Sequence, residues 1–244
     1  MPFLDVNLVF QDLSQKLITQ HDERVVQALR LSIGAEGELK LNYSAPWPIN
    51  LLLNSNILDK YGKIFIFYWN LKYVQIRLTQ IWSDRRILKP ADKRGVTNAI
   101  QLRVNLLRAQ MSHVVESLLS YLQLDVVEAQ FEQAIEKMKD PNADFDQVVR
   151  LHQDYLVAVM QQSFFAAPAL LRAIEGLQHV CLAFCNNIAS CDELQLEHLI
   201  NEFKQRVGLL FTLLSGMYRQ APYLTKLLQN LDFNQYFSSK VMQL

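Results

Sequence analysis

Glycine and proline are scarce in this chain: 7 of each occur among 244 residues, which is about half of their usual share. Turns that join neighbouring β-strands depend on these two residue types, so a fold made of many strands is excluded. Leucine and glutamine, which favour helices, are by contrast abundant. The composition therefore predicts an all-α protein.

An excess of charge of either sign is also lacking, since 24 Lys and Arg residues balance 24 Asp and Glu residues. A dedicated nucleic-acid-binding protein normally carries a basic excess, so this class is disfavoured. No apolar run approaches the ~18 residues of a membrane-spanning helix, and the first residues do not resemble a secretory signal. The three cysteines do not make a disulfide framework in so long a chain. We therefore expect a cytosolic protein without nucleic-acid or membrane partners.

Apolar residues recur at helical spacing along most of the chain. The clearest signal is an apolar stripe whose positions are four and three residues apart: Ile57, Tyr61, Ile64, Tyr68, Leu71, Gln75, Leu78 and Trp82. We expect helices over residues 4–19, 23–32, 57–84, 97–123, 124–139 (after a bend), 145–165, 168–189, 193–217 and 222–231. No period of roughly 30–45 residues repeats, so an irregular antiparallel bundle of about 8–10 helices is predicted rather than a solenoid.

Two helix starts carry local signals. Residues 140–144 read DPNAD and predict a turn, after which Asp144 and Gln147 have the spacing of a capping box. Pro168 suits the first turn of the helix that it begins. The five residues 140–144 are thus expected to form the turn between two helices.

Residues 38–50 follow a different pattern. Leu39, Leu41 and Tyr43 alternate with polar residues, and two prolines at positions 46 and 48 then exclude a regular helix. The pattern predicts extended chain that enters a Pro-Trp-Pro loop, with Asn50 or Ser55 as the cap of the next helix. We expect residues 1–35 to be a helical lead-in to a domain over residues 36–244, together one structural unit.

Charge is unevenly distributed along the chain. Residues 57–110 carry 11 basic and 3 acidic side chains, a net charge of +8, whereas residues 111–202 carry 4 basic and 14 acidic ones, a net charge of −10. One interpretation is that basic and acidic helices pack as neighbours and attract each other. The other is that residues 57–110 present a basic face to an acidic partner, which raises the association rate more than the affinity. The sequence leaves both open.

Signs of catalysis or metal binding are weak. Neither a GxxxxGK phosphate loop nor a GxGxxG motif occurs. Cys181, Cys185 and Cys191, with His179 nearby, make a zinc site conceivable, but the apolar residues around them favour buried thiols. The histidines stand singly on separate predicted helices: His21, His113, His152, His179 and His198. We predict a protein that is not an enzyme and holds no metal or cofactor.

Several longer segments carry a family resemblance. LNYSAPWPINLLL at 41–53 and LDKYGKIFIFYWNLKYVQIRLTQIW at 58–82 contain a Tyr, a Trp-Pro pair and a Lys-Tyr pair that opens a helix closing at Trp. Further segments follow at 107–132, 143–164 and 227–237. In this order they resemble the family of γ-tubulin complex components over nearly the whole chain. The stretches 143–164 and 227–237 are most similar to the component 4 type.

The resemblance implies a function that the composition does not. The carboxy-terminal half of the family is a helical domain that binds γ-tubulin, and the amino-terminal half makes lateral contacts between components; together they form a ring from which microtubules nucleate. This chain resembles the carboxy-terminal half. The implied partners are γ-tubulin and other components of the complex. The implied location is the cytoplasm and cytoskeleton, at the centrosome or another microtubule-organising centre and at the spindle.

Candidate contact residues follow from the resemblance and from charge. Lys60 and Lys72 match the family's long helix and are assigned to γ-tubulin; charge alone adds Arg77, Arg103 and Arg108. The alternative is that these cations are solvated or paired with the acidic helices. Tyr43, Trp47 and Pro48 are expected to fix the loop that seats the long helix. The remaining family positions are Tyr61, Trp82, Met111, Tyr121 and His152.

Two other functions stay open. The chain could be a helical adaptor, or a regulator that competes for γ-tubulin without building a ring; it would then bind without any gain in nucleation. A nucleotide-dependent enzyme is opposed by the missing phosphate loop, since GTP in such a system would belong to γ-tubulin.

Overall fold

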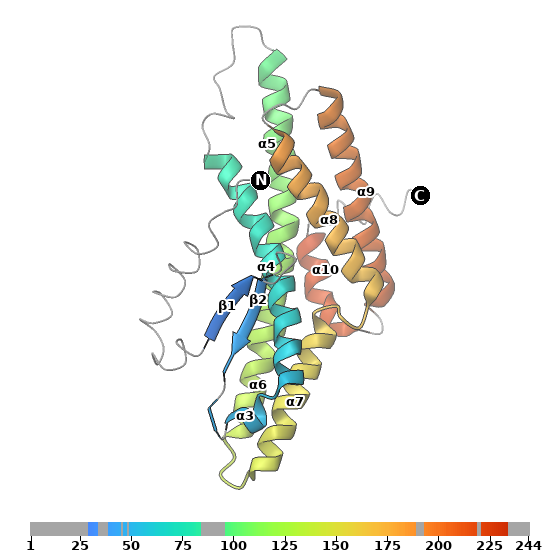
Figure 1. Ribbon diagram of the computed structural model, residues 1–244. Helices are drawn as coiled ribbons and strands as arrows, with labels where there is room; N and C mark the ends of the chain where they lie inside the picture. Colours follow the sequence, from blue (N-terminus) through green and yellow to red (C-terminus); the bar gives the residue numbers. More distant parts are fainter. Residues whose placement is uncertain are drawn as a thin grey trace. The chain divides into compact units, whose positions relative to one another are not determined.

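The computed structural model describes residues 29–33, 39–44, 46–47, 49–83, 96–188, 193–218 and 221–233. The chain forms two compact units, residues 1–67 and residues 68–244, and helix α4 (Ser55–Ser83) contributes to both (Figure 1). The predicted helix over residues 4–19 lies outside the described residues. The predicted domain boundary after residue 35 stays a prediction.

The first unit contains a β-hairpin. Strand β1 (Leu29–Ile33) pairs antiparallel with β2 (Leu39–Tyr43), so that Leu29 lies opposite Tyr43 and Ile33 opposite Leu39. The extended chain expected before the Pro-Trp-Pro loop is confirmed by β2. The prediction of a helix over residues 23–32 is wrong for residues 29–32, which belong to strand β1. The reason is visible in the sequence, because the apolar residues of β1 alternate with a period of two, as those of β2 do.

A short helix, α3 (Ile49–Leu52), follows the hairpin and precedes α4. The cap of α4 is Asn54, whose Oδ1 accepts a hydrogen bond from the Ile57 N–H at 3.1 Å. The sequence had suggested Asn50 or Ser55 as the cap, and both are wrong. Asn50 lies inside α3, and Ser55 is already the first residue of α4. A capping side chain must precede the first helical residue to reach the N–H of the third.

The described residues of the second unit form helices joined by turns and short loops. Its helices are α5 (Val96–Ser120), the π-helix η1 (Tyr121–Glu128), α6 (Ala129–Met138), α7 (Phe145–Gln162), α8 (Pro168–Asn187), α9 (Glu193–Met217), the 3-10 helix η3 (Pro222–Leu224) and α10 (Thr225–Leu231). The all-α prediction and the helices expected after residue 97 are confirmed, with bounds that differ by a few residues. The described residues hold eight α-helices, α3 to α10.

The helices of this unit pair as sequence neighbours. Helix α6 lies beside α7, and α8 lies beside α9 with the opposite direction (Figure 1). The capping box at the start of α7 is confirmed: Asp144 Oδ1 accepts from the Gln147 N–H at 2.7 Å, and Gln147 Oε1 accepts from the Asp144 N–H at 3.2 Å. Pro168 is in the first turn of α8, as predicted.

Apolar side chains from every long helix form the core. The expected stripe of α5 is confirmed as buried: Leu107, Met111, Val114, Leu118 and Tyr121. On α4 the buried seam within the second unit is Leu71, Val74, Leu78 and Ile81. Tyr68 and Gln75 were expected in this seam and are half-buried. Among the described helices, none combines the length and apolarity that a membrane span requires.

Candidate partner-binding surface

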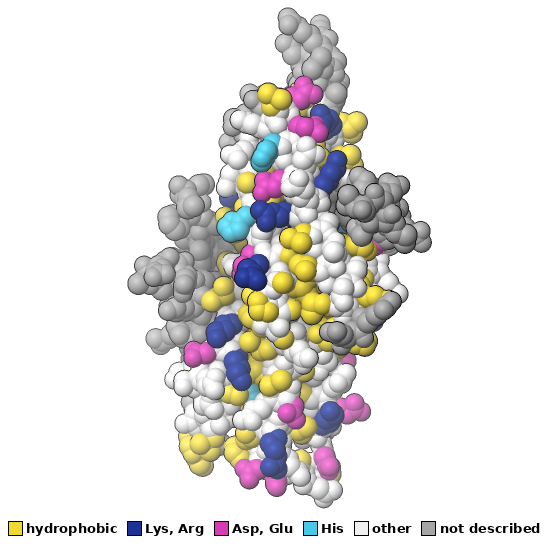
Figure 2. Space-filling view, turned by 90° about the vertical axis from the view of Figure 1, so that its right-hand side faces the viewer, with side chains coloured by type: hydrophobic (Ala, Val, Ile, Leu, Met, Phe, Trp, Pro, Cys, Tyr) yellow, Lys and Arg dark blue, Asp and Glu magenta, His cyan; other side chains and the backbone are white. Residues whose placement is uncertain are grey.

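Charged side chains of both signs are interspersed on the surface. On the face shown in Figure 2, Lys and Arg side chains lie next to Asp and Glu side chains, and hydrophobic side chains stand between them. The described side chains on this side of the molecule therefore form no continuous basic face.

The cysteines on α8 have the character of core residues. Cys181 and Cys185 are buried free thiols, and burial raises the pKa of both, that of Cys185 to about 12 although the nearby Arg77 charge lowers it. A thiol with so high a pKa is a poor nucleophile and a poor metal ligand at neutral pH. Within the described residues, no group of three His, Cys, Asp or Glu side chains is arranged to hold a metal ion; Cys191 lies outside them.

Three of the predicted family positions face the core of the second unit. Met111 and Tyr121 are fully buried, and the Tyr121 hydroxyl donates to the Gln162 carbonyl oxygen at 3.1 Å. His152 is buried on α7 with its ring centroid 6.3 Å from that of Tyr155. Burial lowers the pKa of His152, which favours the neutral imidazole. These positions pack the bundle and do not form an outward site.

The family positions of the first unit are more exposed. Tyr43 and Tyr61 are half-buried, whereas the Trp47 side chain is 79% exposed. Ile49 and Leu51 next to it are exposed as well. Pro48 lies outside the described residues, so the role of Tyr43, Trp47 and Pro48 in fixing the loop stays a prediction. Trp82, a family position of the second unit, lies in the last turn of α4.

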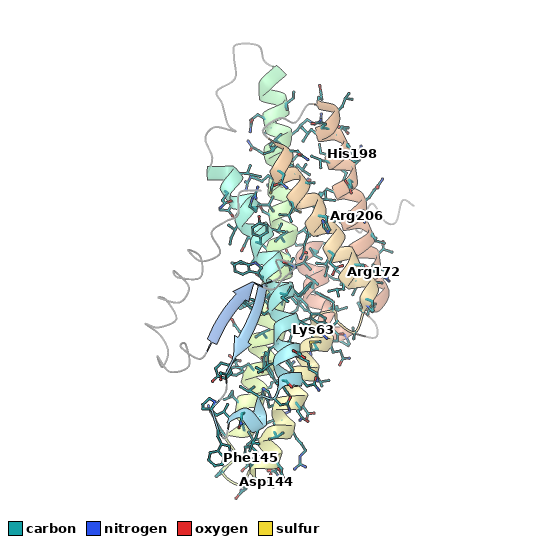
Figure 3. The ribbon with its side chains drawn as sticks, in the orientation of Figure 1. Lys63, Asp144, Phe145, Arg172, His198 and Arg206 are labelled. Carbon is teal, nitrogen blue, oxygen red and sulfur yellow. The ribbon has the colours of Figure 1, made fainter. Side chains whose placement is uncertain are left out.

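Basic side chains are present on both helices of the α8–α9 pair. Figure 3 labels Arg172 on α8 and Arg206 and His198 on α9. Arg206 pairs with Glu202 on its own helix at 3.6 Å. Its side chain also crosses to α8, where a Cβ at Gly176 would lie 3.0 Å from an Arg206 guanidinium nitrogen. Gly176 thus leaves room for Arg206 between the two helices.

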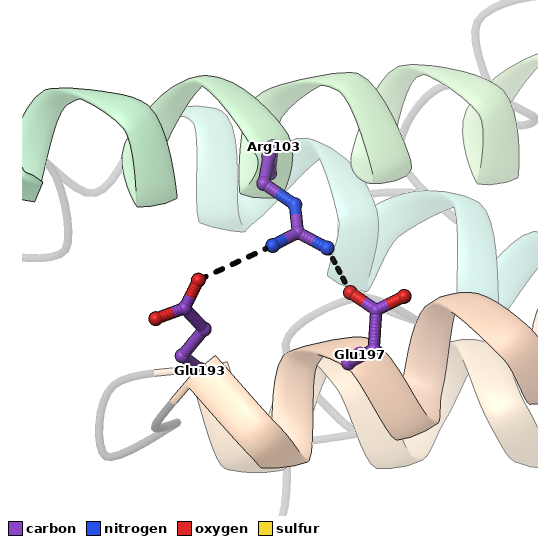
Figure 4. Close-up of polar contacts among 3 residues, drawn as sticks. All are labelled: Arg103, Glu193 and Glu197. Carbon is purple, nitrogen blue, oxygen red and sulfur yellow. Dashed lines mark hydrogen bonds and ion pairs between the residues drawn. The ribbon is translucent and has the colours of Figure 1, made fainter.

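Arg103 joins α5 to the start of α9 (Figure 4). Its guanidinium donates a hydrogen bond to Glu197 and lies 3.5 Å from a carboxylate oxygen of Glu193. These two carboxylates stand one turn apart on α9, so one arginine reaches both. For Arg103, the interpretation that basic and acidic helices attract each other as neighbours is therefore the correct one.

Arg77 has a similar internal role. It donates to the Tyr73 hydroxyl at 3.3 Å and to Asn186 Oδ1 at 3.1 Å, and the second bond ties α4 to the end of α8. Arg108 is half-buried on α5. Charge at these two positions is thus partly withdrawn from solvent.

Lys72 is the predicted cation with an exposed side chain in the second unit. Its ammonium donates to Gln75 Oε1 at 2.7 Å, within the same helix face of α4. Lys60 is half-buried and belongs to the first unit. Within the second unit, Arg77 bonds to the end of α8 and Arg103 to the start of α9, so both have partners inside the unit.

An apolar feature next to Arg103 was not anticipated. Leu102 and Leu106 on α5 are 70% and 59% exposed, and Leu194 on α9 is 82% exposed. We call Leu102, Arg103, Leu106, Glu193, Leu194 and Glu197 the α5–α9 surface. A pocket adjoins it, lined by Asn187, Leu194, Gln195, His198 and Leu199. The signal was present in the sequence, since residues 102 and 106 share a helix face that differs from the buried stripe through residue 107. Exposed leucines on one face of a helix suit contact with another protein.

Comparison with protein families gives a match over nearly the whole chain. The family model described as "Gamma tubulin complex component C-terminal" matches residues 5–237. This range includes all the helices described above. It also includes both the α5–α9 surface and Lys72.

Curated relatives point to the same family. The chain is 28% identical to "Gamma-tubulin complex component 4 homolog" of Medicago truncatula over 86% of this chain and 31% of that protein. It is 27% identical to "Gamma-tubulin complex component 4" of Homo sapiens over 96% of this chain and 40% of that protein. "Spindle pole body component 98" of Dictyostelium discoideum is 28% identical over 52% of this chain and 16% of that protein. The chain thus spans between about a third and two fifths of the component 4 relatives.

Proposed function

The chain belongs to the family of γ-tubulin complex components, as a component 4-like C-terminal region, and from this premise we propose that it binds γ-tubulin and holds it in position for microtubule nucleation. The observation that carries the proposal is the family match over residues 5–237. The domain acts as a template without a covalent step of its own, and the binding energy comes from buried contacts.

Partners and location follow from the same family. Besides γ-tubulin, the partners are other components of the complex. By the family resemblance, their lateral contacts run mainly through the amino-terminal half; this chain spans 31% and 40% of two of the relatives. The location is the cytoplasm and cytoskeleton, at microtubule-organising centres and the spindle. A relative named for the spindle pole body supports this location.

Two kinds of contact are available for γ-tubulin. Lys72 supports an electrostatic contact, because its side chain is exposed and bonds only along its own helix to Gln75. Leu102 and Leu106 support an apolar one, because both side chains are mostly exposed. Arg77 and Arg103 are less suitable, since their bonds to α8 and α9 would have to be broken first.

The test is size-exclusion chromatography with light scattering of the full chain mixed with γ-tubulin. We expect a 1:1 complex that Lys72→Glu weakens, and that weakens further as salt is added. Lys204→Glu, at an exposed position of α9, is the matched control and should leave binding unchanged. If Leu102→Asp with Leu106→Asp abolishes a salt-insensitive complex instead, the contact is apolar. If no complex forms at micromolar concentrations while the chain is helical and monomeric, the proposed function is wrong.

The alternative function is that of a helical adaptor or competing regulator, which would occupy γ-tubulin without building a ring. A nucleation assay with γ-tubulin and tubulin separates the two. Binding without any gain in the number of microtubules supports the regulator, and a gain supports the template.

A further inference from the structure

The helix between α5 and α6 changes its hydrogen-bond pattern for eight residues. From Tyr121 to Glu128 the chain forms the π-helix η1, with α-helix before and after it. Where the ladder returns to the α pattern, the Ala129 N–H donates to both the Leu124 and the Val126 carbonyl oxygens. Such segments are rare, mostly shorter, and frequent at functional sites. The bend that the sequence suggested near residue 124 is realised as this change of helix type.

A π-helix fixes the relative rotation of the helices on either side. Each N–H bonds to the carbonyl oxygen five residues back instead of four. The segment η1 therefore contains about one residue more than an α-helical segment that would join α5 to α6 in the same orientation. If η1 became α-helical, α6 would turn by about 100° about its axis and shift by about 1.5 Å relative to α5. Helix α6 carries α7 with it, because Phe131 packs edge-on against Tyr155 at 6.1 Å.

The start of η1 is held by a buried anchor. Tyr121 donates its hydroxyl to the Gln162 carbonyl oxygen at 3.1 Å, and its ring lies 5.7 Å from that of Phe164. Phe164 has φ = 70°, the left-handed region that glycine normally occupies at a helix end. The bond from the Phe165 N–H to the Met160 carbonyl oxygen at 3.2 Å closes this turn. A bulky residue keeps this conformation because its ring is buried against Tyr121.

The middle of η1 is held from the surface. Lys226 of α10 donates to Asp125 Oδ1 at 2.7 Å. The Lys226 side chain is 72% exposed and that of Asp125 is 22% exposed. Unlike the buried anchor, this ion pair can be reached by a binding partner or by salt. The ion pair thus joins α10 to η1.

We propose that η1 is a two-register joint between α5 and the α6–α7 pair, and that the ion pair of Lys226 with Asp125 latches it in the π register. In the second register η1 is α-helical and the α6–α7 pair is turned relative to α5. A partner that engages Lys226 or Asp125 in only one register shifts the balance between the two. The joint is independent of the proposed γ-tubulin binding.

Hydrogen–deuterium exchange of the full chain, read by mass spectrometry, tests the latch. In Lys226→Ala and in Asp125→Asn, the amides of residues 121–128 should exchange about fivefold faster than in the unchanged chain, while those of α8 keep their rates. Glu202→Gln is the matched control, because it removes an ion pair of similar exposure within α9. Unchanged exchange of η1 in both latch variants overturns the proposal, as does an equal rise in every helix.

Deletion of Leu124 tests the two registers directly. Its side chain is exposed, so the deletion removes the extra residue with little loss of core and keeps the faces of α5 and α6 in phase. We expect a folded chain whose residues 121–128 exchange as slowly as α5 and no longer respond to Lys226→Ala. If the deletion variant still responds to Lys226→Ala, η1 is not a register joint. If it fails to fold, η1 does not hold one removable extra residue, and the proposal is overturned.

Discussion

The α8–α9 pair and the η1 region are held in different ways. Helices α8 and α9 are regular and meet along a seam of buried apolar side chains that includes Ile174, Leu177, Leu196 and Leu210. The η1 region departs from α-helical geometry; besides its buried side chains, it is held by directional contacts from Tyr121 and Lys226. An apolar seam has no single essential bond, whereas a directional contact can be removed by one substitution. The first is suited to be a scaffold and the second to be a point of movement.

The largest expected effect concerns the buried anchor of η1. Phe164→Ala and Phe164→Gly should each lower the free energy of unfolding by about 3–5 kcal/mol, because each removes a buried ring. The glycine variant should be the more stable of the two by about 1 kcal/mol, since φ = 70° strains alanine and not glycine. Urea unfolding followed by circular dichroism measures both. An alanine variant that is the more stable would show that φ does not stay positive at this position.

Removing one side chain from the α8–α9 seam should have a comparable but smaller effect. Leu177→Ala creates a cavity in the core and should lower the free energy of unfolding by about 2–5 kcal/mol. Leu209→Ala, at an exposed position of α9, is the control and should change it by less than about 0.5 kcal/mol. Both are read from urea unfolding. Equal effects at the two positions would contradict the assignment of this seam to the core.

The hydroxyl of Tyr121 should contribute less. Tyr121→Phe keeps the ring against Phe164 and removes the hydrogen bond to the Gln162 carbonyl oxygen, so we expect a loss of about 1 kcal/mol. The loss should be local: hydrogen exchange should rise in residues 121–128 more than in α8. A rise of equal size in both would mean that the bond supports the whole bundle and not η1 in particular.

The sequence predicted the regular parts of the fold well. The stripe through Leu107, Met111 and Leu118 was recognisable because helical spacing is repeated over many turns. The capping box of Asp144 and Gln147 was recognisable because its contacts lie within four residues. Signals that repeat, or that close within one turn, need no knowledge of the tertiary structure.

The parts that escaped prediction depend on short patterns or distant partners. Strand β1 covers five residues, too few for its two-residue period to outweigh a helical interpretation. In a π-helix each N–H bonds to the carbonyl oxygen five residues back, and in an α-helix to the one four residues back. The spacing of apolar residues over the eight residues of η1 does not distinguish the two. The partner of Arg103 is 94 residues away, so its role as a bridge between α5 and α9 required the structure. Leu102 and Leu106 are an exception, because the predicted stripe through Leu107 already places them on another face of the helix.

The smallest expected effect compares glycines within the α8–α9 pair. Gly208 and Gly216 lie inside α9, where an added Cβ would meet nothing within 4 Å. Gly208→Ala and Gly216→Ala should each raise the free energy of unfolding by about 0.5–1 kcal/mol, because alanine is the better helix former. Gly176→Ala is the matched control on α8: its Cβ would meet the Arg206 guanidinium at 3.0 Å, so the gain should be reduced or lost. Urea unfolding of the three variants gives the comparison. If Gly176→Ala raises the free energy of unfolding as much as the other two variants, Arg206 moves aside freely and does not help to hold α8 and α9 together. If Gly208→Ala does not raise it, the face of α9 that carries Gly208 is covered in solution.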